Sequence, residues 1–437
     1  MKVEPRKVVI VGGGFAGISV ANRLKHSSAE ITIIDRSNHH LFQPLLYQVA
    51  TGGLSPGDIA APIRAIFGKD RNIKVLMGEV KSIEAKENEL TLINGNKVQF
   101  DQLVLAPGAQ DNFFGHEDWK QYASGLKTLG DALQIRERIL LSLEEAEQLE
   151  DPEKRQPFLT YVIIGGGPTG VETAGAIAEI ARTSMRRNFR NINENEVKVY
   201  LVEAASEILN GFAKPLNGKA RKMLEKLGVQ VLLETPVINI ERDLVHLKVG
   251  RISTPNIIWA AGIKASSLLD YLHVEQDRMG RVVVNQDLSV PGYPNIFVLG
   301  DSAHFKDEQG VPLPAMASVA KQQGQFLGRL LSVDSLPLPN KFKFKYENKG
   351  TMATVGRAKA VAEFKSFKSS GLFAWFLWSA VHILLLVGFR NRMRVFFEWI
   401  WHYLTFKRGV QLITDRTNCH NCAPNTIRKT ALLTGNY

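Results

Sequence analysis

The sequence predicts an α/β protein with two copies of a strand–turn–helix–strand unit, followed by an amphipathic helical region at the C-terminus. Three observations predict this class. A glycine-rich turn follows a short β-branched run near residue 12, the same pattern returns near residue 165, and the composition becomes basic and aromatic from about residue 341. A chain of 437 residues suits two or three domains, so the repetition predicts two similar domains and an appended region.

The first copy begins with a strand at residues 8–11 and a turn at residues 12–17 (GGGFAG). A helix is expected at 18–25 and a second strand at 31–34, ending at Asp35. Gly12 permits the tight turn, Gly14 lets the backbone approach a phosphate, and Gly17 lets the helix pack on the strand. The helix N-terminus then attracts a pyrophosphate, and Asp35 is placed to accept hydrogen bonds from a ribose. The agreement of these parts favours a dinucleotide site over an ordinary glycine turn.

The second copy repeats this order with a strand at 161–164, a turn at 165–170 (GGGPTG), a helix at 171–180 and a strand at 197–202 that ends at Glu203. An acid at that position favours NADH, because it would repel the 2′-phosphate of NADPH. Two copies in one chain predict two dinucleotides, most economically an electron donor and an acceptor.

Periodicity predicts the remaining elements of the two domains. A charged helix is expected at residues 129–149. Further strands are expected at residues 73–77, 89–92, 103–105, 230–233, 244–249, 257–259, 282–284 and 296–299.

The net charge of +11 indicates an anionic partner, which could be nucleic acid, an acidic membrane surface or phosphorylated small molecules. No apolar signal core precedes residue 8, so we expect a cytosol-facing protein. The only cysteines, Cys419 and Cys422, exclude a disulfide framework and favour a reducing compartment. They have C-x-x-C spacing, but no second ligand pair exists for zinc and they lie in a polar tail. We expect no metal site.

The C-terminal region favours a membrane surface as the anionic partner. Residues 341–345 alternate like an edge strand, and residues 372–389 are nearly uncharged but contain His382. Residues 393–406 bring several apolar side chains near one helix face, flanked by Arg and Lys; these are Phe396, Trp399, Ile400, Tyr403 and Leu404. Two helices lying in the membrane surface are favoured; a single span and a buried dimerisation hairpin are the alternatives. This placement of basic residues accounts for the charge better than nucleic acid, which we do not expect as a partner.

With these motifs, the sequence resembles the two-dinucleotide-binding flavoproteins and, within them, the type II NADH:quinone oxidoreductases. The resemblance covers nearly the whole chain. It rests on residues 12–17 with Asp35, 42–50 (FQPLLYQVA), 105–108 (LAPG), 165–172 (GGGPTGVE), 259–262 (WAAG) and 297–301 (FVLGD).

The resemblance implies a glutathione-reductase-like fold with three parts. Residues 1–115 and 285–335 would form a discontinuous FAD-binding domain, residues 157–284 an NADH-binding domain, and residues 341–437 a membrane-associating region. The implied FAD-binding residues are Gly12, Gly14, Phe15, Ala16, Gly17, Asp35, Arg36, Pro44, Leu45, Val80, Ala106, Gly108, Asp301, Ala317 and Ser318. The implied NADH-binding residues are Gly165, Gly167, Pro168, Thr169, Gly170, Glu203 and Gly262.

Two residues are implied in proton delivery. Glu172 resembles a carboxylate that the family places near the meeting point of nicotinamide and flavin, and Gln322 matches a glutamine beside the flavin and quinone. One departure affects the quinone site. The family often shows AQxAxQxG, whereas residues 317–324 read ASVAKQQG, so Ser318 replaces the first glutamine. A quinone hydrogen bond there would be re-sited or mediated by water.

The expected function is therefore that of a peripheral membrane flavoenzyme of a respiratory chain. It would oxidise NADH and reduce a membrane quinone by hydride transfer through FAD, without proton pumping, on the cytoplasmic face of the cell inner membrane. Its partners would be the quinone and the bilayer surface, with a homodimer left open. Sulfide oxidation and disulfide reduction are not expected, because both need cysteines beside the flavin and the two cysteines here lie in the tail. The non-enzymatic alternative is an NADH-sensing, partner- or membrane-binding flavoprotein resembling relatives of apoptosis-inducing factor.

Overall fold

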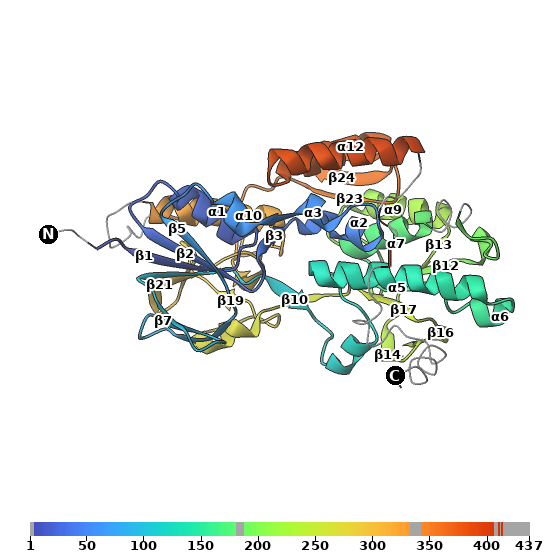
Figure 1. The fold of residues 1–437 in the computed structure, drawn as a ribbon, viewed down its shortest axis with the longest axis horizontal. Helices are drawn as coiled ribbons and strands as arrows, with labels where there is room; N and C mark the ends of the chain where they lie inside the picture. The colour runs from blue at the N-terminus through green and yellow to red at the C-terminus, as the bar shows by residue number, and fades with distance from the viewer. Residues whose placement is uncertain (1–3, 181–187, 333–341, 406–409, 411, 414–437) are drawn as a thin grey trace, which may run out of the picture. The chain divides into compact units, whose positions relative to one another are not determined.

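The computed structural model describes residues 4–180, 188–332, 342–405, 410 and 412–413 (Figure 1). The two cysteines of the tail lie outside these residues. By its contacts the chain forms two compact units. Unit 1 contains Met1–Leu41, Ala60–Gln110 and Ile263–Lys349; unit 2 contains Phe42–Ile59, Asp111–Gly262 and Gly350–Tyr437. The predicted cofactor domains are defined by binding rather than by compactness, so their limits stay a prediction.

Unit 1 is built on a six-stranded sheet that is parallel except at one edge strand. Its order is β20 (Ser289–Val290), β21 (Tyr293–Val298), β9 (Gln102–Leu105), β1 (Lys7–Val11), β2 (Glu30–Asp35) and β5 (Ile73–Met77), with β20 antiparallel to β21. The central strands are almost wholly buried because both faces of the sheet are covered. Helices α1 (Phe15–Leu24) and α10 (Ala317–Leu331) pack closely on each other, since a Cβ on Gly324 would collide with the Ala16 carbonyl.

The remaining elements of unit 1 surround this sheet. The elements are β3 (His39–Leu41), β4 (Ala60–Pro62), α4 (Ile63–Ile66), β6 (Val80–Glu84), β7 (Glu89–Leu92), β8 (Lys97–Gln99), η5 (Ser267–Leu272), β19 (Val282–Val283), η6 (Gly300–Ser302) and β22 (Ala303–His304). The three-stranded sheet β6–β7–β8 and the helix η5 pack their apolar side chains against the face of the six-stranded sheet opposite α1. The chain leaves unit 1 in β10 (Ala109–Asp111) and re-enters it in β18 (Ile263–Ala265).

Unit 2 contains a second parallel sheet, ordered β13 (Val229–Leu232), β12 (Lys198–Val202), β11 (Thr160–Ile164) and β17 (Asn256–Trp259). The pairing repeats that of unit 1, because each glycine turn follows the strand that lies between its two parallel neighbours. Two parallel sheets with covering helices confirm the predicted α/β class and the duplication.

The larger helices in this part of unit 2 are α5 (Leu129–Gln148), α7 (Pro168–Ile180) and α9 (Lys214–Lys226). Of these, periodicity predicts α5 and α7 but not α9. The smaller elements are η1 (Gln43–Leu45), α2 (Leu46–Ala50), α3 (Pro56–Ile59), η2 (Glu117–Gln121), α6 (Pro152–Arg155), η4 (Glu194–Glu196), and the antiparallel β14 (Val237–Glu241), β15 (Leu244–Leu247) and β16 (Arg251–Ser253).

The C-terminal part of unit 2 contains a small sheet that the sequence did not predict. Strands β23 (Thr351–Thr354), β24 (Ala360–Phe364) and β25 (Phe367–Gly371) are antiparallel, and α11 (Leu372–Leu385) packs on all three. Helix α12 (Phe389–Thr405) follows a short break and runs along the same side as β23 and β24 (Figure 1). Of the helices that the structure describes, none has the length and apolarity needed to cross a membrane.

Two sequence-based expectations for this region are corrected. Residues 342–349 form no strand; instead Phe344 is buried against Phe305 and Phe326, and its N–H donates to the Gln286 carbonyl. Helix α12 is apolar on two faces rather than one. Trp399 is buried, whereas Phe396, Phe397, Ile400 and Leu404 are exposed. Successive residues are turned by 100° around a helix, so Trp399 can face inward while its neighbour Ile400 faces outward.

Candidate functional site

Each unit contains one glycine turn that is shaped as an anion cradle. In unit 1, Gly12 has φ +105°, and a Cβ there would collide with the Ala106 carbonyl. A Cβ on Gly17 would collide with the Gly12 carbonyl, so both positions require glycine for the close packing of the turn. Gly14 differs, because no atom lies within 4 Å of the Cβ position. The open space at Gly14 is where a phosphate can approach the backbone.

The cradle of unit 2 repeats this arrangement position by position. Gly165 has φ +111° and lies against Ala260, Gly170 lies against the Gly165 carbonyl, and Gly167 has open space at its Cβ position. Ala106 and Ala260 therefore occupy equivalent places at the ends of β9 and β17. This agreement supports the same ligand chemistry in both units.

The acid at the end of the second strand holds each cradle together. The N–H of Gly13 donates to Asp35 Oδ2 at 2.6 Å, and the N–H of Gly166 donates to Glu203 Oε2 at 2.5 Å. Each carboxylate oxygen can accept more than one hydrogen bond, so these contacts leave capacity for ribose hydroxyls. Both acids thus lie at the cradles, as the motif spacing predicts.

His40 contributes to the first cradle, although it is no part of the glycine motif. Its Nδ1 lies 2.9 Å from the Gly13 carbonyl, so the Gly13 peptide is held at both ends by side chains. In the second cradle a backbone group replaces the histidine, since the N–H of Leu209 donates to the Gly166 carbonyl. Burial lowers the pKa of His40, which keeps the ring neutral, with Nδ1 as the donor.

Asp301 follows a left-handed Gly300 that lies between α1 and α10. Gly300 has φ +66°, and its nearest neighbours are Ala320 and Ala16. The N–H of Gly300 donates to Gln323 Oε1 at 2.7 Å. Gln323, which sequence reasoning missed, therefore positions the turn that presents Asp301 beside the start of α1. The only sequence feature that could have indicated Gln323 is its position next to Gln322 on α10.

The other predicted FAD residues are distributed over both units. Ala106, Gly108, Phe15, Arg36, Val80, Ala317 and Ser318 lie in unit 1, whereas Pro44 and Leu45 belong to the η1 segment of unit 2. The Gly108 carbonyl accepts a hydrogen bond from Ser302, and the hydroxyls of Ser318 and Tyr346 lie 3.0 Å apart.

Gln322 is engaged by the main chain. Its Nε2 donates to the Glu347 carbonyl at 2.9 Å, and its Oε1 accepts the Glu347 N–H at 3.0 Å. This pairing fixes the segment after residue 342 to α10. A role for Gln322 in proton delivery stays a prediction.

The predicted NADH residues all lie in unit 2. Pro168 is the first residue of α7, a position where its missing N–H is not needed, and Thr169 is exposed next to it. Gly262 has φ +151°, and a Cβ there would lie 2.8 Å from the Phe114 ring.

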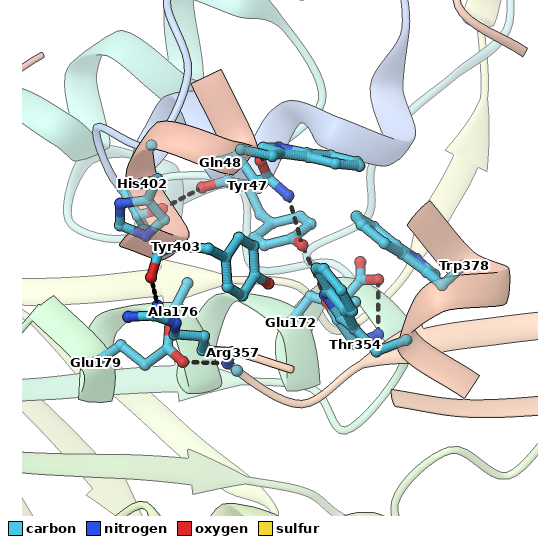
Figure 2. Close-up of a pocket in the computed structure, with 15 residues that line it drawn as sticks. Tyr47, Gln48, Glu172, Ala176, Glu179, Thr354, Arg357, Trp378, His402 and Tyr403 are labelled. Carbon is cyan, nitrogen blue, oxygen red and sulfur yellow. Dashed lines mark hydrogen bonds between the residues drawn. The ribbon is translucent and has the colours of Figure 1, made fainter. Parts of the chain in front are cut away.

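Unit 2 also contains a hollow of about 560 Å³, which includes space open to solvent (Figure 2). Glu172, Ala176 and Glu179 line it from one face of α7, since residues three and four apart lie on the same side of a helix. Other lining residues come from the segment of α2, from β23 and the loop after it, and from α11 and α12. They are Tyr47, Gln48, Thr51, Gly53, Thr354, Gly356, Arg357, Trp375, Trp378, Trp399, His402 and Tyr403.

Glu172 is the buried acid of this pocket. Its Oε1 accepts the N–H of Thr354 at 3.2 Å, and only 8% of the residue is exposed. Burial raises the pKa of Glu172 to about 8, and the hydrogen bonds from Thr354 oppose that rise. The carboxyl group is therefore protonated at neutral pH and can give up a proton.

Aromatic rings from the C-terminal helices form the opposite wall. Trp378 stacks on Trp399 at 5.3 Å, and Trp375 lies 4.6 Å from Tyr403. At the far end, the Arg357 guanidinium lies 4.8 Å from the centre of the Tyr403 ring, and the Arg357 N–H donates to Glu179. The pocket combines flat apolar walls with an ionisable floor, which suits a planar apolar molecule that takes up protons.

The comparisons with known proteins agree with this arrangement. The profile of the pyridine nucleotide-disulphide oxidoreductase family matches residues 6–324, and that of the NDH2 C-terminal domain matches residues 348–408. Two relatives from Mycobacterium tuberculosis, the type II NADH:quinone oxidoreductases Ndh and NdhA, are each 39% identical; each alignment covers 94% of this chain and 90% of the relative. The solved structure of NDH2 from Plasmodium falciparum in complex with NADH has a similar fold, with a TM-score of 0.85 and 21% identity over 94% of this chain and 100% of that one.

Proposed function

Because this chain belongs to the type II NADH:quinone oxidoreductases of the pyridine nucleotide-disulphide oxidoreductase family, we propose which of its residues perform the oxidation of NADH and the reduction of quinone. FAD is the cofactor of this reaction, NADH the donor and a quinone the acceptor. When bound, FAD accepts a hydride from the nicotinamide and passes two electrons to the quinone.

The cradle of unit 1 fits FAD. The open space at Gly14 admits a pyrophosphate, and Asp35 keeps the Gly13 peptide in place while retaining acceptor capacity for a ribose. We assign Asp301 to the same ligand, because Gly300 and Gln323 place it beside the start of α1. These assignments come from the shape of the unit itself.

The cradle of unit 2 fits NADH. Gly167 offers the matching open space, and Glu203 stands where a 2′-phosphate would be repelled. The preference for NADH over NADPH follows from that negative charge.

The pocket that Glu172 lines is the site we propose for the quinone. This pocket is the main observation on which the proposed roles of the residues rest. A quinone ring is flat and apolar, and the tryptophans from α11 and α12 offer flat apolar surfaces. Among the described residues, the buried Nε1 of Trp378 has no hydrogen-bond partner, so a quinone carbonyl would satisfy it. Glu172 would supply a proton to the reduced ring.

The outer faces of α11 and α12 are the surface we propose for contact with lipid. On α12, Phe389, Met393, Phe396, Phe397, Ile400, Trp401 and Leu404 are exposed; on α11, so are Leu372, Phe373, Phe376, Leu384 and Leu385. On α12 the spacing of three and four residues makes one exposed apolar stripe, and Arg390 and Arg394 are exposed on the same helix. Such a surface suits the interface plane of an anionic membrane. A quinone dissolved in the lipid would then enter the pocket on the side that α11 and α12 line. The inner membrane and its cytoplasmic face are the expected location.

A steady-state assay tests the proposed pocket. FAD-loaded protein should consume NADH only when a short-chain quinone is present. The Ala176→Leu variant should fill part of the pocket, raising KM for the quinone several-fold while KM for NADH is kept. Ala176→Ser, which hardly changes the volume, is the matched control. Absence of quinone-dependent NADH loss by FAD-loaded protein would contradict the function, and an unchanged quinone KM in Ala176→Leu would remove the quinone from this pocket.

A further inference from the structure

A row of hydrogen-bonded groups connects helix α12 with Glu172 along the wall of the pocket (Figure 2). Trp399 Nε1 donates to Gln48 Oε1 at 2.9 Å, and Gln48 Nε2 donates to the Tyr47 hydroxyl at 3.0 Å. The Tyr47 and Thr354 hydroxyls lie 2.9 Å apart, and the Thr354 N–H donates to Glu172 Oε1 at 3.2 Å, which places the Thr354 side chain beside the carboxyl group. Four segments far apart in sequence therefore contribute to one continuous row.

The direction of hydrogen bonding in this row is fixed at the Trp399 end. An indole N–H can only donate, so the Gln48 amide must turn its oxygen toward Trp399. The amide nitrogen, which can only donate, then faces Tyr47. The Tyr47 oxygen is consequently an acceptor on that side.

The hydroxyl of Thr354 can complete the row from the other side. A hydroxyl accepts two hydrogen bonds and donates one, so the Tyr47 oxygen can accept from both Gln48 and Thr354. Its own O–H then remains available for a molecule in the pocket that Tyr47 lines. Burial raises the pKa of Tyr47, which keeps the phenol protonated.

The overall reaction requires such a proton source. A quinone becomes a quinol by gaining two electrons and two protons, whereas the hydride of NADH carries two electrons and one proton. The second proton must come from the solvent through the protein.

We propose that Tyr47 donates this proton to a quinone oxygen and is re-protonated from Glu172 through the hydroxyl of Thr354, with Trp399 and Gln48 as positioning residues. As the O–H bond of Tyr47 breaks, one forms on the reduced quinone; the Thr354 proton moves to Tyr47 and the Glu172 proton moves to Thr354. Both hydroxyls are restored and Glu172 is left as a carboxylate, which solvent protonates again. This inference rests on the quinone occupying the proposed pocket.

Rapid mixing of the FAD-loaded enzyme separates the two halves of the reaction. In Tyr47→Phe, the loss of flavin absorbance after NADH should keep its wild-type rate within about twofold. The return of that absorbance after a short-chain quinone should slow on the order of 10²-fold, as for loss of a general acid. Tyr161→Phe is the matched control, because this buried hydroxyl has no hydrogen-bond partner among the described residues and lies outside the pocket. It should leave both rates unchanged.

A second pair of variants tests the relay if Tyr47→Phe fails to retain FAD. Thr354→Val removes the intermediate hydroxyl and should slow the quinone half-reaction, whereas Thr354→Ser should restore it. A merely structural role would not follow the hydroxyl in this way. The inference is overturned if FAD-loaded Tyr47→Phe is re-oxidised at the wild-type rate, or if Thr354→Ser is as slow as Thr354→Val. A wild-type protein whose reduced flavin does not respond to quinone would instead overturn the proposed function, and the inference with it.

Discussion

Thr354 donates its backbone N–H to the carboxyl group of Glu172, although the two residues are 182 positions apart in the chain. The bond joins the helix that leaves the second cradle to the first strand of the C-terminal sheet. The C-terminal part of the chain therefore completes the environment of the buried acid in addition to offering an apolar surface.

The pKa of Glu172 predicts a pH dependence of the quinone half-reaction. Burial raises that pKa to about 8, so the carboxyl group holds its proton below pH 8 and loses it above. The rate of flavin re-oxidation by quinone should be constant below this value and fall up to tenfold per pH unit above it. Around Glu172, Tyr47 and Thr354 belong to the row of hydrogen-bonded groups, and Glu179, Arg357 and His402 line the same pocket. Glu172→Gln should lower the rate and abolish the decline near pH 8; a decline that persists in this variant would assign it to another group.

The same shift affects stability with a defined sign. Between the ordinary value of 4.5 and about 8, the folded protein holds a proton that the unfolded chain has released. The free energy of unfolding should therefore fall as pH rises through this window. Denaturant titrations of wild type and Glu172→Gln at pH 5 and 8 measure the difference. An equal pH dependence in both proteins would contradict this cause.

The two cradle glycines predict opposite consequences of alanine substitution. Gly14→Ala should fold, because its φ is −77° and no atom lies near the added Cβ, but the methyl group would occupy the space of the pyrophosphate. FAD affinity should fall at least tenfold, while the melting temperature of the FAD-free protein should not change. Gly17→Ala should lower that melting temperature, since its Cβ collides with the Gly12 carbonyl. Flavin titration with thermal unfolding distinguishes them; undiminished FAD binding by Gly14→Ala would reject the cradle.

Glu203 predicts the choice between NADH and NADPH. Glu203→Gln keeps an oxygen for the Gly166 N–H but removes the charge that repels a 2′-phosphate. Replacing a charge-assisted hydrogen bond by a neutral one costs about 1 kcal/mol, so kcat/KM for NADH should fall roughly fivefold while that for NADPH rises. Glu225→Gln, an exposed acid on α9, serves as the control. An unchanged ratio of the two donors would remove Glu203 from donor selection.

The exposed stripe on α12 predicts lipid binding that one charge can weaken. Phe397→Glu should reduce co-sedimentation with anionic phospholipid vesicles about tenfold or more, because it removes an aromatic side chain worth about 2 kcal/mol and adds repulsion. Turnover with a soluble quinone should be kept. Ile93→Glu is the matched control, since Ile93 in unit 1 is similarly exposed, at 62% against 59%. Wild-type binding by Phe397→Glu, or dimers that this variant disrupts, would assign the stripe to another partner.

Much of the fold could be predicted from local pattern. Strand β5 and helix α5 lie within one residue of their predicted limits, because buried strands and capped helices have short-range signals. The sheet β23–β25 was missed, since strands such as Thr351–Thr354 are short and lack a marked alternation. Contributors such as His40 and Gln323 were missed because the glycine motif specifies no residue at their positions, and only the fold brings them to Gly13 and Gly300.

The sequence by itself determined the two cradles. Each consists of a strand, three glycines, a helix and an acid at the end of the next strand. Because these parts follow one another in one continuous segment, the sequence alone identifies the turn and its acid. The pocket was decided only by the tertiary structure. Tyr47, Glu172, Thr354 and Trp399 come from four distant segments, and no local pattern says that Trp399 faces inward while Phe397 faces out. Their meeting depends on which helix faces are buried when α7, β23 and α12 pack together, which is a property of the folded chain as a whole.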